Sequence, residues 1–209
     1  DEVGISRCLP QYDTYADDPD NDEGLMLSLW HALDEADIVV AHNLARFDLP
    51  KAMSRFAYHD LGPPSPFKQV DTLKLAKRHF RFTSNRLDDL GAHLGLGRKQ
   101  QHEGFGLWKR VMAGDMDAWD EMVTYCNQDV VLLRNVYHRL LPYCSGVPNL
   151  AIYEDAERPL CTKCGSADLT KNGNAFTRLS KYQRYRCNEC GAFSRGRARI
   201  GSLPQTSGV

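Results

Sequence analysis

The chain has 209 residues, of which 42% are hydrophobic and 25% charged, so it can bury one sizeable core and a small second unit. No stretch approaches the roughly 20 apolar residues of a membrane span, and the first residues are acidic, so we expect neither membrane insertion nor export. Charge is uneven: residues 1–150 carry 16 basic and 22 acidic side chains, whereas residues 151–209 carry 10 and 5. The acidic body suits carboxylates that gather divalent cations, and the basic end favours a nucleic-acid partner.

The first 142 residues combine short apolar runs with helical patterns, which predicts an α/β domain. Asp22 and Asp71 are expected to cap the helices that follow them. The predicted strands are Val3–Leu9, a buried central strand at Ile38–His42, and Phe67–Val70. The predicted helices are Glu23–Glu35, Arg46–Tyr58, Thr72–His79, Leu87–Leu94, Leu107–Met112 and Met116–Leu141. Residues 143–159 are expected to form a linker, residues 160–200 a second domain and residues 201–209 a disordered tail.

Tyr125 and Asp129 lie four residues apart in the last predicted helix. They therefore share one face and can present a hydroxyl and a carboxylate to one small site. By itself this spacing more often gives a half-buried aromatic ring and a solvated charge. A functional interpretation needs a second acidic motif elsewhere in the chain.

Such a motif follows the predicted central strand. Ligands gather at the carboxyl ends of strands in open α/β sheets, and Asn43 and Asp48 occupy that position. If the helix with Asp129 packs across the same sheet, Asp48 and Asp129 converge into a carboxylate pair of the kind that holds Mg²⁺ or Mn²⁺. Two such ions activate water and stabilise the leaving oxygen in phosphodiester cleavage.

The ordered motifs are Ala41-His42-Asn43 with Phe47-Asp48, then Asp71-Thr72, then Tyr125 with Asp129. Together they resemble the DEDD-type 3′-5′ exonucleases of the ribonuclease H-like fold, in the subgroup with Tyr in the third motif. The second motif of that family is Asn followed five residues later by Asp, and its third is Tyr-x-x-x-Asp. The resemblance covers about Val3 to Leu141 and implies a mixed sheet flanked by helices.

The resemblance also implies roles for individual residues. Asp129 would ligate the catalytic metal directly, and Asp48 would help to hold a second ion. Tyr125 would orient the attacking water, and Asn43 would lie near the terminal nucleotides of the substrate. His42 is expected to support the strand end.

A polar loop that precedes the predicted short helix at Leu107 carries further cations. Arg98, Lys99 and His102 are expected to contact the phosphate backbone of a substrate, although a solvated loop is the equal alternative.

The family's first motif, Asp-x-Glu on the opening strand, has no match here. Asp1 and Glu2 are adjacent rather than spaced by one residue, and they precede what resembles the last strand of the family's initial three-strand meander. We therefore expect the chain to be an N-terminal truncation that lacks the first two strands and binds catalytic metal poorly.

Four of the seven cysteines form two Cys-x-x-Cys pairs separated by 22 residues: Cys161, Cys164, Cys187 and Cys190. Two such turns deliver four thiolates in the tetrahedral arrangement that zinc prefers, and a glycine follows each pair. The other three cysteines stand isolated. This distribution predicts one structural zinc site in a reducing compartment, cytoplasmic or nucleoid-associated, rather than a disulfide framework.

Between the cysteine pairs, predicted strands at Leu169–Phe176 and Tyr182–Arg186, with an Asn-Gly turn signal, resemble a zinc ribbon. Three cations, Lys181, Arg184 and Arg186, alternate with tyrosines, which suits contact with phosphates and stacking on bases. The alternative is a structural zinc knob with a solvated basic face.

The sequence thus predicts a metal-dependent 3′-5′ exonuclease domain joined to a zinc ribbon that aids binding of nucleic acid, with DNA favoured over RNA. A second hypothesis is a non-catalytic nucleic-acid-binding module on a degenerate nuclease scaffold. A third is a zinc-ribbon adaptor for protein interactions. An Asp-x-Glu strand ahead of these residues would favour the enzyme.

Overall fold

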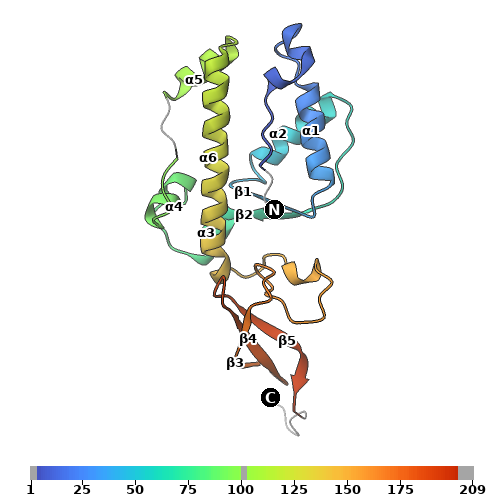
Figure 1. Ribbon diagram of the computed structural model, residues 1–209, viewed down its shortest axis with the longest axis vertical. Helices are drawn as coiled ribbons and strands as arrows, with labels where there is room; N and C mark the ends of the chain where they lie inside the picture. The colour runs from blue at the N-terminus through green and yellow to red at the C-terminus, as the bar shows by residue number, and fades with distance from the viewer. Residues whose placement is uncertain (1–3, 100–102, 202–209) are drawn as a thin grey trace. The chain divides into compact units, whose positions relative to one another are not determined.

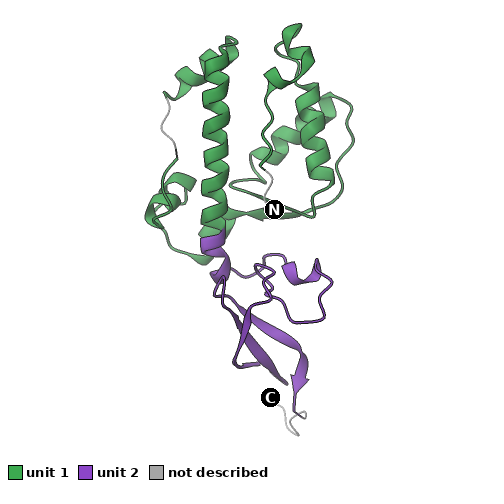
Figure 2. Cartoon of the chain, viewed as in Figure 1, with its two compact units in different colours: residues 1–137 green, residues 138–209 purple. Residues whose placement is uncertain are grey.

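The computed structural model describes residues 4–99 and 103–201. It divides into two compact units, residues 1–137 and 138–209, and the boundary falls inside the longest helix, α6 (Met116–Leu140) (Figure 2). The first unit contains a two-stranded parallel sheet and the second a three-stranded antiparallel sheet. The fold is therefore mixed α/β, as predicted. None of the described helices is long and apolar enough to cross a membrane.

The parallel sheet pairs β1 (Ile38–Ala41) with β2 (Lys68–Asp71) in the first unit (Figure 1). The register aligns Ala41 with Asp71 at the carboxyl ends of the two strands. Because parallel strands end at the same edge, the turn after β1 lies beside the last residue of β2. Both strands lie where the apolar runs predicted them.

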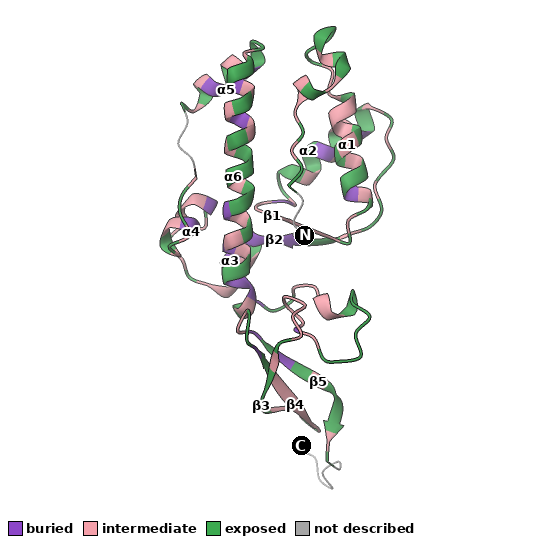
Figure 3. Cartoon of the chain, in the orientation of Figure 1, coloured by how far each residue is buried: buried purple, intermediate pink, exposed green. Residues whose placement is uncertain are grey.

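Helices α1 (Glu23–Asp34) and α2 (Asp48–Tyr58) share a hydrophobic core. Its buried members are Leu33, Ala52 and Phe56. Figure 3 shows buried positions on both helices. These residues recur at helical spacing, so each helix buries one stripe and exposes the other face.

The predicted role of Asp22 as a side-chain cap of α1 is wrong. Asp22 occupies the N-cap position, but its side chain makes no capping hydrogen bond. Its carboxylate accepts a hydrogen bond from Arg55 Nε at 2.7 Å and lies 2.6 Å from His59 Nε2. The hydrogen bond from Arg55 lowers the pKa of Asp22. The carboxylate thus ties the start of α1 to the end of α2, because a charge-assisted pair competes better for it than backbone N–H groups.

The remaining helices of the first unit are α3 (Thr72–His79), α4 (Leu87–His93) and α5 (Phe105–Met112). Helix α5 packs on the start of α6 through a second core. The buried members of that core are Leu107, Val111, Ala118 and Met122.

The predicted strand at Val3–Leu9 is wrong for its described part, residues 4–9. No strand forms there, and two 3₁₀ turns follow, η1 (Leu9–Gln11) and η2 (Asp13–Ala16). Pro10 lacks the N–H that a ladder needs, and no described strand pairs with this segment. The segment packs on α6 instead, where the indole of Trp119 donates to Tyr15 Oη at 3.1 Å.

The second unit contains two 3₁₀ turns and a sheet in the order β3-β4-β5. The elements are η3 (Leu141–Tyr143), η4 (Leu150–Ile152), β3 (Leu169–Phe176), β4 (Lys181–Cys187) and β5 (Phe193–Ile200). Strand β5 was not predicted. The Asn-Gly pair at Asn172 lies inside β3, where the register shifts, so it forms a bulge, and the chain reverses between Thr177 and Ser180.

Candidate active site and zinc site

The residues after β1 form a tight turn beside the end of β2. Asn43 has a φ of +73°, a left-handed conformation that Asn tolerates better than most residues. Its backbone N–H donates to Asp71 Oδ1 at 3.0 Å. The same oxygen accepts from the N–H groups of Leu73 and Lys74, so Asp71 caps α3, as predicted. Asp71 therefore also holds the second motif in place, a role that was not predicted.

Asp71 is buried, with 7% of its surface exposed, and its other oxygen, Oδ2, has no hydrogen-bond partner among the described residues. A buried carboxylate oxygen without a partner costs free energy. The clamping role could have been found from the sequence, because Asp71 ends a strand that is parallel to the one before Asn43.

Asp48 is the first residue of α2 and is exposed. The protein atoms that surround its carboxylate raise its pKa by desolvation, and the charge of Asp71 adds to the rise. A cation beside Asp48 would oppose that rise, because an opposite charge favours the ionised carboxylate.

His42 has both ring nitrogens engaged. Nδ1 lies 2.8 Å from Thr72 Oγ1, and Nε2 lies 3.0 Å from the carbonyl oxygen of Asn85. Since a carbonyl only accepts, Nε2 carries the proton of the neutral ring. Burial lowers the pKa of His42, which favours that neutral form. The ring thus ties the end of β1 to the segment before α4.

Tyr125 and Asp129 lie one turn apart on α6, and both face Lys99. The ammonium of Lys99 donates to Asp129 Oδ2 and, at 3.3 Å, to Tyr125 Oη. Burial alone would lower the pKa of Lys99, but these hydrogen bonds raise it above its ordinary value. The other oxygen, Asp129 Oδ1, is buried and has no partner in the described part of the chain.

The position of Lys99 is fixed by the packing of α4. Its backbone N–H donates to Asp88 Oδ1 at 2.8 Å. A Cβ on Gly91 would meet the carbonyl oxygen of Gly97 at 2.6 Å and Leu132 Cδ1 at 2.8 Å. Only glycine therefore lets α4 approach both the loop that carries Lys99 and the side of α6.

Lys99, which contacts Asp129, also acts on His42 at the end of β1. After burial, the charges of Asp71, Lys99 and Asp48 are the electrostatic influences on the pKa of His42. Across residues 4–99 and 103–201, however, the only group of three or more metal-ligating side chains within 4.8 Å is the cysteine group. Asp48 and Asp129 thus belong to no closed carboxylate cluster.

Hard oxygen donors remain available for a divalent ion. Asp129 Oδ1 is unpartnered, and the carboxylate of Asp48 is exposed, so both fit Mg²⁺ or Mn²⁺ better than a soft metal. Other predicted contributors lie elsewhere: Arg98 donates to Asp88 Oδ2 at 2.9 Å. His102, Asp1 and Glu2 lie outside the described residues.

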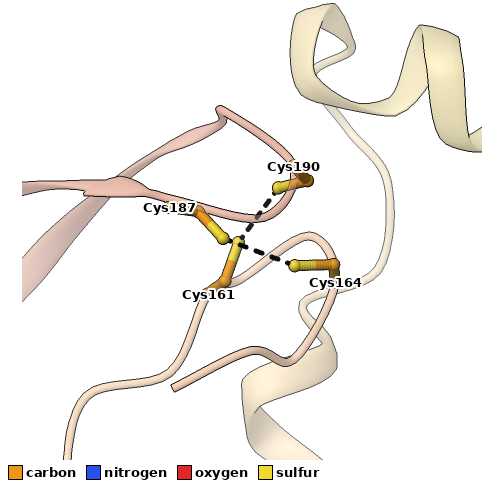
Figure 4. A group of neighbouring side chains, drawn as sticks. All are labelled: Cys161, Cys164, Cys187 and Cys190. Atoms are coloured by element: carbon orange, nitrogen blue, oxygen red, sulfur yellow. Dashed lines mark hydrogen bonds between the residues drawn. The ribbon is translucent and has the colours of Figure 1, made fainter. Parts of the chain in front are cut away.

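The four paired cysteines come together in the second unit (Figure 4). Their sulfur atoms all lie within 4.8 Å of one another, with Sγ to Sγ distances of 3.6 Å for Cys161 to Cys190 and for Cys164 to Cys187. Tetrahedral zinc with Zn–S bonds of about 2.3 Å requires sulfur separations of about 3.8 Å. The arrangement can therefore bind zinc without rearranging.

Two matching turns build this site. The N–H of Gly165 donates to Cys161 O, and the N–H of Gly191 donates to Cys187 O, each at 3.0 Å. Both glycines have φ near the left-handed region, +76° and +78°. Burial raises the pKa of Cys190 to about 11, so a cation is needed to keep that thiol deprotonated at neutral pH.

The predicted basic residues of β4 have different environments. Arg184 donates to Asn172 O at 2.8 Å and to Asn172 Oδ1 at 3.2 Å, and its guanidinium lies 5.4 Å from the ring of Phe193. It thereby stabilises the bulge in β3. Arg186 is exposed, and Lys181 is half-buried at the start of the strand.

A family model describing the RNase H superfamily matches residues 6–141. The chain belongs to the RNase H superfamily. No curated protein and no solved structure matches it. The match includes both halves of the candidate active site and ends before the cysteine site. RNase H superfamily nucleases hydrolyse nucleic acids with the help of divalent metals, which supports a nuclease function at this coarse level.

Proposed function

We propose that the protein is a metal-dependent 3′-5′ exonuclease that hydrolyses phosphodiester bonds and releases nucleoside monophosphates. The observation that carries the proposal is the Tyr125–Asp129 pair on one face of α6, with a buried, unpartnered oxygen of Asp129, inside the part of the chain that matches the RNase H superfamily. The unpartnered oxygen of such a buried carboxylate can coordinate a cation, which would offset the free-energy cost of its burial.

Each residue of this site has one task in the proposal. Asp129 and Asp48 hold Mg²⁺ or Mn²⁺, which would supply charge stabilisation for the phosphodiester and activation of water. The hydroxyl of Tyr125 orients the attacking water. Asn43, in its clamped turn, contacts the terminal nucleotide through its side chain. With a divalent ion held by Asp129, the ammonium of Lys99 would be available to neutralise phosphate charge.

No Asp-x-Glu lies ahead of Asn43 in the sequence, so the proposed ligands in this chain are Asp48 and Asp129. We therefore expect this chain to bind metal weakly and to have impaired activity. For activity measurements, the 209-residue chain is compared with a designed version to which an Asp-x-Glu strand has been added ahead of these residues.

That form is expected to shorten single-stranded DNA labelled at the 5′ end one nucleotide at a time with Mg²⁺ or Mn²⁺. A 3′-phosphorylated strand should resist, because hydrolysis begins at the terminal 3′ nucleotide. Denaturing gels of both strands, with an RNA strand of the same sequence, measure polarity and sugar preference. Internal cuts in a circular strand would contradict exonuclease action.

The second unit aids binding in this proposal. The four cysteines hold a structural Zn²⁺ that fixes the three-stranded sheet. Lys181, Arg184 and Arg186 of β4 give the unit positive charge for the phosphate backbone.

One observation favours a second candidate function, a non-catalytic nucleic-acid-binding module. The ammonium of Lys99 already neutralises Asp129 in the described structure, and no closed carboxylate cluster occurs among the described residues. On this alternative, Lys99 replaces the metal permanently, and the unit serves as a scaffold.

Lys99→Ala distinguishes the two candidates. If Asp129 is a metal ligand, removing the competing cation should raise the affinity of the chain for Mn²⁺ by about tenfold, because a unit charge near a divalent ion is repelled. Titration followed by electron paramagnetic resonance of free Mn²⁺ measures this. Lys99→Arg keeps the charge and is the matched control. Unchanged Mn²⁺ affinity in Lys99→Ala would favour the scaffold.

A further inference from the structure

The second unit contains a hollow of about 1110 Å³ that the sequence did not predict. It lies between the segment 149–162 and the exposed side of strands β4 and β5, and we call it the β5 groove. Its two sides have opposite charge. One side carries three carboxylates and one cation, Glu154, Asp155, Glu157 and Arg158, and the other carries Arg195, Arg197 and Arg199.

The basic side of the β5 groove follows from the spacing of arginines in β5. All three are exposed. The guanidinium of Arg195 lies 4.6 Å from the ring of Tyr182. The side chains of Arg197 and Arg199 have no ion-pair or hydrogen-bond partner in the described part of the chain. Two adjacent charges without partners are available to an anion.

An aromatic ring lies at the base of the groove. Tyr185 lines it, and a Cβ built on Gly196 would contact Tyr185 Cε2 at 3.5 Å. The absence of a side chain at Gly196 therefore leaves this edge of the ring uncovered. Lys171, paired with Tyr185 across β3 and β4, adds another cation beside the ring. Cations next to an accessible aromatic ring suit a phosphate backbone with unpaired bases.

The acidic side of the groove is exposed as well, and no ion pair joins it to β5 among the residues that the structure describes. Its carboxylates repel a polyanion. A nucleic-acid strand in the groove would therefore lie along β5, and the segment 154–157 would lower its affinity. Removal of the arginines should therefore weaken binding of nucleic acid, and removal of the carboxylates should strengthen it.

We propose that the β5 groove binds single-stranded nucleic acid, with Arg197 and Arg199 on the phosphates and Tyr185 stacked on a base. The inference rests on the proposed function, because it supplies the single strand that the exonuclease would consume. It assigns the main contact to β5 rather than to the cations of β4.

The test uses the zinc-loaded 209-residue chain without added Mg²⁺ or Mn²⁺ and a fluorescent oligothymidylate, with anisotropy measured over a range of salt concentrations. Arg197→Ala with Arg199→Ala should weaken binding about tenfold. The slope of log affinity against log salt should fall in magnitude by about 1.4, about 0.7 for each lost phosphate contact. Lys77→Ala with Arg78→Ala removes the same charge from exposed positions of α3 and should change affinity by less than about twofold.

The opposite change removes the acidic side. Glu154→Gln, Asp155→Asn and Glu157→Gln together should tighten binding severalfold at low salt, with the difference shrinking as salt rises. Unchanged zinc content in each variant shows that the unit is folded. Parental affinity and slope in the arginine variant would overturn the inference, and so would weaker binding in the acidic-side variant.

Failure of this inference is distinguishable from failure of the proposed function. Binding by the β5 groove and cleavage are measured in separate assays, and Arg197 and Arg199 have no role in the proposed cleavage chemistry. Groove-dependent binding without cleavage in the longer form would contradict the exonuclease alone. If the longer form cleaves but substitution of Arg197 and Arg199 does not weaken binding, only the inference about the β5 groove is contradicted.

Discussion

Asp129→Asn is expected to reduce exonuclease activity by more than about 100-fold in a form of the protein that carries the Asp-x-Glu strand. Substitution of groups that only support metal ligands costs about 10- to 100-fold, and loss of a ligand's charge should cost more. Asn has nearly the shape of Asp, so the core around α6 should remain packed. The loss of activity can then be attributed to the lost negative charge of residue 129 and to its weaker coordination of the metal ion.

The direct readout for this substitution is metal binding by the 209-residue chain. Asp129→Asn should lose Mn²⁺ affinity, and the loss should persist in the Lys99→Ala background, because the ligand itself is missing. Gln128→Ala is the matched control, since its exposed side chain lies next to Asp129 on α6 and has no described partner. Full activity in Asp129→Asn would remove this residue from the proposed site.

The strands and helices around the motifs could be predicted because their signals are local. The run Ile38–Ala41 is apolar and β-branched, and the period of α6 is regular over many turns. The cysteine site is equally local, because each Cys-x-x-Cys turn places two sulfurs by itself. Tertiary structure only has to bring two such turns together.

The environment of Asp129 could not be predicted in the same way. Lys99 reaches it from a loop whose position depends on Gly91, on Asp88 and on the side of α6 at Leu132. The contacts with α6, Lys99 to Asp129 and Gly91 to Leu132, join residues about thirty to forty positions apart, and neither period nor composition encodes them. Lys99, which the sequence predicted to contact phosphates, therefore donates a hydrogen bond to Asp129, a proposed metal ligand.

Strand pairing explains the errors at both ends of the chain. Residues 4–8 have strand-like composition but no described partner strand. A high β-propensity does not by itself produce a strand when no other strand is available for pairing. Strand β5 contains three arginines and a glycine, and its composition did not predict a strand. It becomes a strand because β4 supplies a ladder from Lys181 to Arg186.

Removal of zinc is expected to unfold the second unit while the first unit keeps its helices. The buried core at the cysteine site consists of Cys161, Cys187 and Ala192, which is too little apolar surface to hold β3–β5 without a cross-link. Structural zinc in small domains contributes about 10–16 kcal/mol at neutral pH, which is comparable to the entire stability of a small domain.

A chelator titration followed by circular dichroism and metal analysis tests this expectation. The parent should contain one zinc per chain, and Cys187→Ser should lose both the zinc and the melting transition of the second unit. Cys126→Ser, which changes an exposed cysteine outside the site, should retain both. A metal-free chain with an unchanged second transition would contradict a structural role.

The same site should make the second unit sensitive to acid. Burial raises the pKa values of Cys164 and Cys190, so without metal these thiols bind protons at neutral pH. Zinc must displace those protons to bind thiolates, and its affinity therefore falls as pH falls. The chelator concentration that removes half the zinc should decrease steadily from pH 8 to pH 6, about where zinc–thiolate sites lose metal to protons. The affinity of the β5 groove for single strands should fall with it, because β5 keeps its position only while the cysteines hold the sheet.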